Sequence, residues 1–221
     1  KVRARDLVIS VSGCTLSIQD PVSFEKIMHT AMQDVRTFME TGQPDKVIQE
    51  IYQPDVMLWA IWAIQQYAKS EGLEKTKELY ADFVRDIINY IVSQKHPDMR
   101  LMDNGLLFAN GKEKAITWMN STINGKPVVP RSGYIVEFNA LWYNALCFYT
   151  ELNGGVPIET LDPIIKSIET SFSETFVNGY NYLFDSVSGS TVDWSVRPNM
   201  IFAVSMQYSP LSRQQKRAVV D

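Results

Sequence analysis

The segment YIVEFNALWYNALCFYT, residues 134–150, has Glu137 as its only charged side chain. A helix without a charged face is covered by protein on all sides, so we expect a buried helix here. Polar Asn139 and Asn144 and the large ring of Trp142 nevertheless stand among its apolar residues. A fold that buries this helix must also give these polar groups partners.

Two other segments have the same uncharged character. Residues 55–68, DVMLWAIWAIQQYA, carry no charge after Asp55, and residues 198–208 carry none at all. We predict that both segments also form buried helices.

Amphipathic segments separate the uncharged ones, with apolar residues at helical spacing and charged residues on the opposite face. The first has Asp20 as N-cap, Pro21 as first helical residue and Gly42 as its stop. The last opens with the capping-box sequence Ser212-Arg213-Gln214-Gln215. The four predicted amphipathic helices cover residues 21–41, 73–93, 157–178 and 212–221.

The predicted helices alternate between amphipathic and uncharged along the chain, as a two-layer array with inner and outer helices requires. Spacing between like helices is irregular, which disfavours a repeat of about 34 residues. We therefore expect an all-α fold, a ring of helical hairpins called an α/α toroid, as a single domain over residues 1–221. Irregular loops, including residues 179–194, and one short strand at residues 106–109 complete the prediction.

Composition excludes several partners. With 45% hydrophobic residues, the 221-residue chain can bury a core as one domain or as a piece of a larger one. The net charge is −4 and no Lys/Arg run could follow a phosphate backbone, so we expect no nucleic acid. No segment approaches the roughly 18 apolar residues that span a bilayer, so we expect no membrane partner.

The cysteines and histidines are few and scattered. Cys14 and Cys147 stand far apart, and the only histidines are His29 and His96. Neither a disulfide scaffold nor a zinc site has enough ligands at suitable spacing. Two ordinary thiols fit a reducing compartment, so we expect a cytoplasmic protein without a metal.

Polar and aromatic residues gather on the uncharged segments and the loops beside them. In a helical ring the inner helices meet at a central cavity, where such groups must pair with each other, water or a ligand. Carboxylates, amides and guanidinium groups suit sugar hydroxyls, while aromatic rings suit the C–H faces of a sugar. The residues concerned are Trp118, Arg131, Asn139, Trp142, Arg197 and Asn199.

Each of these residues also has a simpler interpretation. Buried polar groups usually satisfy one another, so Glu137 can simply pair with Arg131. Trp59, Trp62 and Trp142 can be core residues. The grouping on three separate buried elements favours a ligand, and the pattern alone predicts a ligand-binding helical domain.

Four segments resemble the C-terminal glucosidase region of glycogen debranching enzymes, the amylo-α-1,6-glucosidase family. The resemblance covers residues 55–221, whereas residues 1–50 match only as a helix pattern. The matching segments are LWAIWAIQQY (58–67), ITWMN with VVPRSGYIVEFNALWYNAL (116–120 and 128–146), RPNMIFAVS (197–205) and YSPLSRQQKRAVVD (208–221).

The resemblance implies a six-hairpin α/α toroid whose cavity holds the glucose at an α-1,6 branch of glycogen or another branched α-glucan. It implies inverting hydrolysis, in which a carboxylic acid protonates the glycosidic oxygen and a second carboxylate activates water. It implies no cofactor. The substrate-binding residues it suggests are Asp55, Trp59, Trp118, Arg131, Asn139, Trp142, Arg197 and Asn199, and the catalytic candidates are Asn120, Glu137 and Asp193.

The chain departs from the family pattern in ways that bear on catalysis. Many members read TWMD where this chain has Asn120, and an amide cannot cycle a proton near neutral pH. Met200 stands where the family suggests Gln. An upstream motif with Gly, Trp and Arg-Asp and a later catalytic carboxylate are both missing, so we expect an internal fragment or a shortened relative with an incomplete toroid.

Two alternatives to hydrolysis remain open. A non-catalytic glucan-binding domain would keep the pocket and is favoured by Asn120. A helical scaffold without a ligand would satisfy every polar group internally. An incomplete ring would also expose an inner helix, so we expect the isolated chain to dimerise or aggregate and not to hydrolyse glucan alone.

Overall fold

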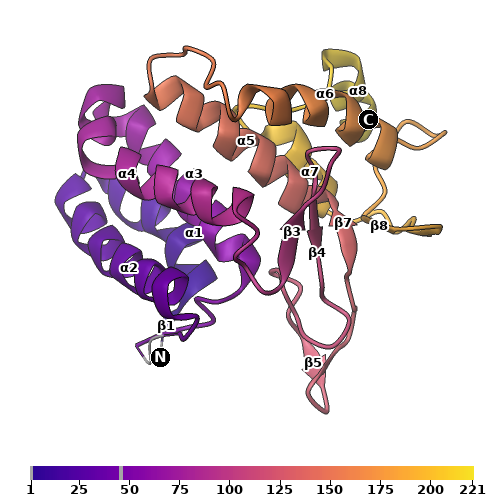
Figure 1. Cartoon of the computed structure of the whole chain (residues 1–221), viewed down its shortest axis with the longest axis horizontal. Coiled ribbons are helices and arrows are strands. Elements are labelled where there is room, and N and C mark those ends of the chain that lie inside the picture. Colours follow the sequence, from indigo (N-terminus) through magenta and orange to yellow (C-terminus); the bar gives the residue numbers. More distant parts are fainter. Residues whose placement is uncertain (1, 45–46) are drawn as a thin grey trace. The chain divides into compact units, whose positions relative to one another are not determined.

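The computed structural model describes residues 2–44 and 47–221 (Figure 1). Contacts divide the chain into two compact units. The first comprises the described residues up to His96 together with Leu152–Gly154, and the second comprises Pro97–Glu151 and Gly155–Asp221. The expected single domain over residues 1–221 stays a prediction.

Helices make up most of the first unit. Its third helix packs against the first and fourth helices and also contacts the second, and these are the helices coloured indigo to magenta in Figure 1. Two short strands, β1 (Val2–Arg3) and β2 (Ile48–Gln49), pair in parallel beside them. The helices are α1 (Ala4–Thr15), α2 (Pro21–Thr41), α3 (Pro54–Glu71) and α4 (Leu73–Val92), with a 3₁₀ turn η1 (Leu16–Ile18) after α1.

Burial of α3 on all sides confirms the prediction made for residues 55–68. Nearly every side chain between Pro54 and Ala68 is buried. One covering helix, α1, was not predicted, because Arg5 interrupts its apolar pattern. Arg5 is itself buried, since its guanidinium pairs with Asp55 at 2.7 Å.

Both ends of α2 lie where the sequence places them. The Asp20 side chain accepts a hydrogen bond from Ser23 N at 3.0 Å, and hydrogen bonds from the side chain and the backbone of Ser23 hold the pKa of Asp20 below its ordinary value. Gly42 adopts the left-handed conformation that ends the helix, with φ of 69°.

The second unit contains four further helices, and α5 is the buried one that residues 134–150 predict. The last helix, α8, opens with the predicted capping box, in which Gln215 N donates to Ser212 Oγ at 3.2 Å and Ser212 N donates to Gln215 Oε1 at 2.8 Å. The helices are α5 (Val136–Leu152, its last residue in the first unit), α6 (Asp162–Phe176), α7 (Asn199–Ser205) and α8 (Arg213–Val220).

Two predicted helices are shorter in the structure. The helix predicted at 157–178 begins only at Asp162, because Pro163 occupies its first turn. The helix predicted at 198–208 is α7, which ends at Ser205. Its Ile201 side chain is 43% exposed, so the prediction that this helix is buried on all sides is wrong within the described chain.

A five-stranded antiparallel sheet makes the all-α description incomplete. Most of it fills loops that were predicted as irregular, and only β4 coincides with the predicted strand at 106–109. Tyr134 and Ile135, predicted as the start of the helix at 134–150, belong to the sheet instead. Periodicity cannot be read from runs of three residues, so the other strands escaped prediction. In sheet order, the strands are β3 (Met99–Leu101), β4 (Leu107–Ala109), β7 (Gly133–Ile135), β8 (Ser186–Ser188) and β9 (Thr191–Asp193).

Figure 1 shows β3, β4 and β7 side by side below the helices of their own unit. A small hairpin, β5 (Thr122–Ile123) with β6 (Lys126–Pro127), turns through Asn124 and Gly125, both at positive φ. None of the described helices has the length and apolar character needed to cross a membrane.

Gly133 is required where β7 pairs with β8. Its φ is 106°, and a Cβ atom there would lie 2.2 Å from the carbonyl oxygen of Val187. A side chain would therefore separate the two strands on which the polar cluster described below depends.

We predict that Gly133→Ala lowers the free energy of unfolding by about 2 kcal/mol or more, because backbone strain and the clash add together. Urea denaturation measures the change. Gly179→Ala is the matched control, since a Cβ there meets nothing within 4 Å. Equal stabilities for the two variants would contradict this role for Gly133.

Candidate functional site

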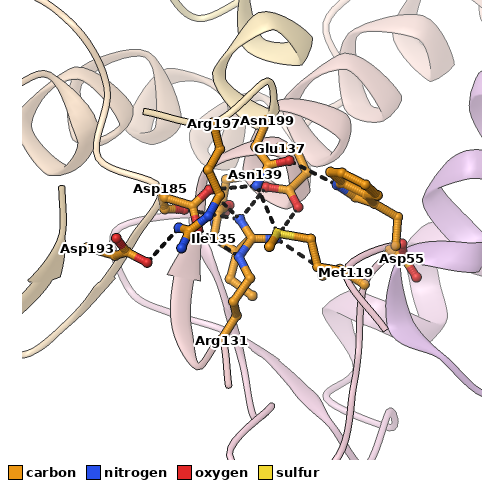
Figure 2. A network of polar contacts seen from close by, with 12 residues as sticks. Asp55, Met119, Arg131, Ile135, Glu137, Asn139, Asp185, Asp193, Arg197 and Asn199 are labelled. Atoms are coloured by element: carbon orange, nitrogen blue, oxygen red, sulfur yellow. Dashed lines mark hydrogen bonds and ion pairs between the residues drawn. The ribbon is translucent and has the colours of Figure 1, made fainter. Parts of the chain in front are cut away.

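A buried guanidinium group, that of Arg131, lies at the centre of a polar network in the second unit (Figure 2). Its Nε and Nη2 donate to the two carboxylate oxygens of Asp185 at 2.9 and 3.0 Å. Nη2 also donates to Glu137 Oε2 at 2.7 Å, and Nη1 donates to the other Glu137 oxygen and to Thr117 Oγ1. Arg131 thus binds two carboxylates at once, each through both oxygens.

Strand pairing brings these groups together. Arg131 precedes β7 and Glu137 follows it, in the first turn of α5. Asp185 immediately precedes β8, and Ile135 of β7 pairs with Ser186 of β8. The sheet therefore places Asp185 beside both residues, although it lies about fifty positions further along the chain.

A close approach of backbone fixes Arg131 from the other side. A Cβ atom on Gly111 would lie 2.0 Å from the Arg131 carbonyl oxygen, so this position has room only for glycine. The loop before β7 is thereby held against the segment that follows β4.

Asp185 connects the two halves of the network, and sequence reasoning missed it. Besides Arg131, its carboxylate accepts from Arg197 Nη1 at 2.8 Å and from Asn199 Nδ2 at 2.6 Å. The sequence does contain a signal, since Asp185 is the only charged residue between Glu174 and Asp193. An isolated carboxylate among aromatic and small residues needs a buried partner.

Asp193 forms the solvent-facing end of the network. Arg197 Nη1 donates to Asp193 Oδ2 at 2.6 Å, and Ser195 N donates to Oδ1 at 2.9 Å. The side chains of Asp193 and Arg197 are 29% and 21% exposed. Partial burial raises the pKa of Asp193, but the hydrogen bonds from Arg197 and Ser195 outweigh it and leave the pKa below its ordinary value.

The network contains three carboxyl groups, Glu137, Asp185 and Asp193, and two guanidinium groups, Arg131 and Arg197. If all were ionised, one negative charge would remain uncompensated. Burial raises the pKa of Glu137, Arg131 opposes the shift, and the neighbouring charge of Asp185 adds to it, so that the net direction is upward. Glu137 is therefore the carboxyl group at which burial favours a proton.

Asn199 and Trp118 extend the network toward a pocket. Asn199 is fully buried, and its Oδ1 accepts from the indole Nε1 of Trp118 at 2.9 Å. The Trp118 ring is 41% exposed, so the hydrogen-bonded chain from Arg131 reaches solvent here as well. A pocket of about 240 Å³ lies at this end, lined by Trp118, Met119, Asn120, Ser121, Val128 and Val129.

Asn139 and Trp142 are fully buried and bond to backbone. Asn139 accepts from Leu107 N at 2.7 Å and donates to Leu107 O and Ile135 O at 3.0 and 3.1 Å. Trp142 Nε1 donates to Gly105 O at 3.1 Å. Both side chains therefore fasten α5 to the segment around β4, and their contact with a sugar stays a prediction.

Asp55 and Trp59 belong to the first unit, where Asp55 is paired with Arg5 through both carboxylate oxygens, at 2.7 and 2.8 Å. Burial raises the pKa of Asp55, while Arg5 and a hydrogen bond with Trp59 oppose the shift. Trp59 is only 3% exposed and packs edge to face with Trp62. Their predicted substrate contacts also stay predictions.

We predict that Arg131→Met destabilises the protein by about 3 to 5 kcal/mol, because it removes the cationic partner of buried Glu137 and leaves Asp185 paired with Arg197. Arg131→Lys should restore only part of the loss, since an ammonium group cannot bind two carboxylates bidentately. Denaturant unfolding measures both changes.

The control for this series is Arg217→Met. Arg217 pairs with Asp221 on the surface, where ion pairs contribute little, so no measurable change is expected. If Arg131→Met unfolded at the same denaturant concentration as the control, the network would not hold this unit together.

Comparison with known protein families identifies the family of this chain. The family model described as amylo-alpha-1,6-glucosidase matches residues 3–221. Its match extends over residues 3–54, which the sequence motifs alone left out of the resemblance. A search of curated proteins gave no significant match. The chain therefore belongs to the amylo-α-1,6-glucosidase family.

Proposed function

We propose that the protein takes part in removing α-1,6-linked glucose at the branch points of glycogen or a limit dextrin, by inverting hydrolysis. The family supports a glucosidase-related function and a glucan substrate. The observation that carries the proposal for this chain is the single hydrogen-bonded network from Glu137 to Asp193, with an arm that ends at the pocket of Trp118.

The pocket offers the groups that a terminal glucose requires. The half-exposed indole of Trp118 provides an apolar surface for the C–H face of a pyranose ring, and the amide of Asn120 provides a donor and an acceptor for hydroxyls. Trp118 is held in place by Asn199, so its ring is oriented before substrate arrives. We assign both residues to substrate binding.

Two carboxyl groups with opposite pKa shifts suit acid and base roles. Asp193 is partly exposed and its pKa is lowered, so it is ionised near neutral pH and can activate a water molecule. Glu137 has a raised pKa and is the candidate for the acid that protonates the glycosidic oxygen. Arg131, Arg197 and Asn199 orient these groups through Asp185.

Asn120 has no catalytic role in this proposal, because an amide does not release a proton near neutral pH. Asn139 and Trp142 hold α5 to the segment around β4. We keep sugar contacts of Asn139, Trp142, Asp55 and Trp59 as part of the proposal. We further propose that the helices form part of an α/α toroid and that the protein works in the cytoplasm.

Glucan binding without hydrolysis is the second candidate function, and one observation favours it. Both Glu137 oxygens already accept hydrogen bonds from Arg131, so Glu137 must exchange a partner before it can donate a proton. Asn120 at the position of the family's candidate acid points the same way. In this alternative the network only positions the binding surface.

For hydrolysis, we predict that Asp193→Asn lowers kcat on a limit dextrin by about 100-fold or more while glucan binding persists, because it removes the base and keeps the shape. Glu137→Gln should cause a similar loss. Release of free glucose measures turnover, and calorimetry with isomaltose-type ligands measures binding.

One control variant and two outcomes complete this experiment. Asp162→Asn changes a partly exposed carboxylate on α6 that pairs with Lys166, and it should leave turnover unchanged. Wild-type protein that binds limit dextrin without releasing glucose would support the binding-only alternative. Turnover retained in both network variants would refute the assigned roles.

The two pKa shifts predict the pH dependence. Asp193 must be ionised, and hydrogen bonds from Arg197 and Ser195 hold its pKa below its ordinary value, so the acid limb of kcat/KM should lie below the pH at which a free Asp carboxyl group titrates. Glu137 must be protonated, and burial raises its pKa above the ordinary range of a Glu carboxyl group, so activity should fall as pH rises through that raised pKa. A pH profile without a loss on the alkaline side would exclude Glu137 as the acid.

We expect the 221-residue chain to self-associate. Apolar side chains such as Ile201 on α7 and Val156 are exposed in it, and exposed apolar surface promotes association. Sedimentation velocity measures the association. A monodisperse monomer would contradict this expectation.

A further inference from the structure

Four aromatic rings lie together beside the exposed end of the network, and none has a role in the site described above. Tyr180 is 77% exposed and Trp194 is 47% exposed. We call the group Tyr180, Tyr182, Phe184 and Trp194 the aromatic ledge. Large rings exposed together, as here, are characteristic of surfaces that bind a partner.

The rings contact one another in an ordered arrangement. Tyr180 and Tyr182 are nearly parallel, with centroids 6.3 Å apart and an interplanar angle of 18°. Trp194 meets Tyr180 at 6.3 Å and Phe184 at 4.5 Å, both edge to face. The ledge therefore connects two segments of the chain, residues 180–184 and the residue that follows β9.

Hydrogen bonds fix the turn that carries the tyrosines. Asn178 N donates to Tyr182 O at 3.0 Å, and Tyr180 N donates to the Asn178 side chain at 2.9 Å. Phe184 N donates to Phe176 O at 2.8 Å, which anchors the turn to the end of α6. The rings are thus held on a constrained backbone, which reduces the entropy lost on binding a ligand.

The ledge is continuous with the candidate site. Trp194 is the residue after Asp193, and Asp193 O accepts a hydrogen bond from Asp185 N at 2.9 Å. The ledge therefore adjoins the segment that carries the partly exposed carboxylate of Asp193 and the guanidinium of Arg197.

The chemistry of the ledge selects a neutral ligand. Asp185 is the only charged residue from 178 to 192, and it is buried, while Arg197 is already paired with Asp185 and Asp193. Nucleic-acid platforms combine stacked rings with free cationic groups, which the described residues of this segment do not offer. Rings with hydroxyl groups at their edges suit the alternating apolar faces and hydroxyls of a sugar chain.

We propose that the aromatic ledge binds the linear, α-1,4-linked part of the glucan and presents the branched substrate to Asp193. The identity of the ligand as an α-glucan rests on the proposed function. The ledge would supply affinity for the chain, whereas the pocket at Trp118 would supply contact with a single glucose.

The test uses the intact protein and maltoheptaose, a linear ligand that contains no α-1,6 bond. Tyr180→Ala and Trp194→Ala should each weaken its binding about tenfold in calorimetry, because each removes a stacking ring. Both variants should raise KM for limit dextrin with little change in kcat. Tyr180→Phe and Trp194→Phe keep a ring and should retain most of the affinity.

Val196→Ala is the matched control. Val196 is 75% exposed in the same segment, so it reports loss of apolar surface without loss of a ring, and it should leave maltoheptaose binding unchanged. Failure of the wild-type protein to bind maltoheptaose would overturn the proposal, and so would equal affinity in the wild type and both alanine variants.

The outcomes separate this proposal from the hydrolase proposal. Hydrolysis of limit dextrin without ring-dependent maltoheptaose binding would overturn the ledge alone. Ring-dependent binding without any glucose release would support the ledge and reject hydrolysis. In a third outcome, the alanine variants would bind maltoheptaose as the wild type does, but would dissociate a dimer that sedimentation detects in the wild type. The ledge would then be a contact between protein chains, and the proposal would be wrong.

Discussion

The second unit depends on one desolvated guanidinium group. Arg131 has lost nearly all contact with water, and that loss is offset only because Glu137 and Asp185 each bind it through two oxygens. Because those two carboxylates lie in different segments, the ion pairs fix the relation of α5 to the β8 segment. Asp185 also accepts hydrogen bonds from Arg197 and Asn199. The position of the Arg131 guanidinium therefore determines, through Asp185, where these two side chains lie.

This arrangement explains why buried polar residues persist where leucine would pack more simply. A hydrophobic cluster can hold segments together, but it cannot orient a partly exposed carboxylate and an indole ring at fixed positions. Here burial raises the pKa of Glu137, whereas hydrogen bonds from Arg197 and Ser195 hold the pKa of Asp193 below its ordinary value. That separation is the feature of the network most useful to a hydrolase.

Much of the helical part of the fold could be predicted from local signals. The N-cap Asp20, the stop at Gly42 and the capping box at Ser212 determine helix ends through contacts within a few residues, and all three are confirmed. The absence of charged residues in the segment around α3 likewise predicted that this helix is buried. Helix α1 was missed because its Arg5 becomes compatible with a core only when Asp55 pairs with it, and that pairing spans fifty residues.

Neither the five-stranded sheet nor the role of Asp185 could be predicted from such local signals. Strands of three residues carry no measurable periodicity, and the role of Asp185 exists only once β7 and β8 pair. Sequence reasoning grouped Arg131, Glu137, Arg197 and Asn199 correctly as residues that need partners, but it could not separate them from Asn139 and Trp142. Those two side chains instead form hydrogen bonds with the backbone of the segment around β4.

The most direct measurement is a crystal structure of the intact protein with bound isomaltose. The account predicts that one glucose ring lies against Trp118 and that sugar hydroxyls contact Asp193 or Arg197, with the Arg131 ion pairs preserved. Sugar density away from these residues, or an Arg131 network that dissolves when the sugar binds, would contradict it.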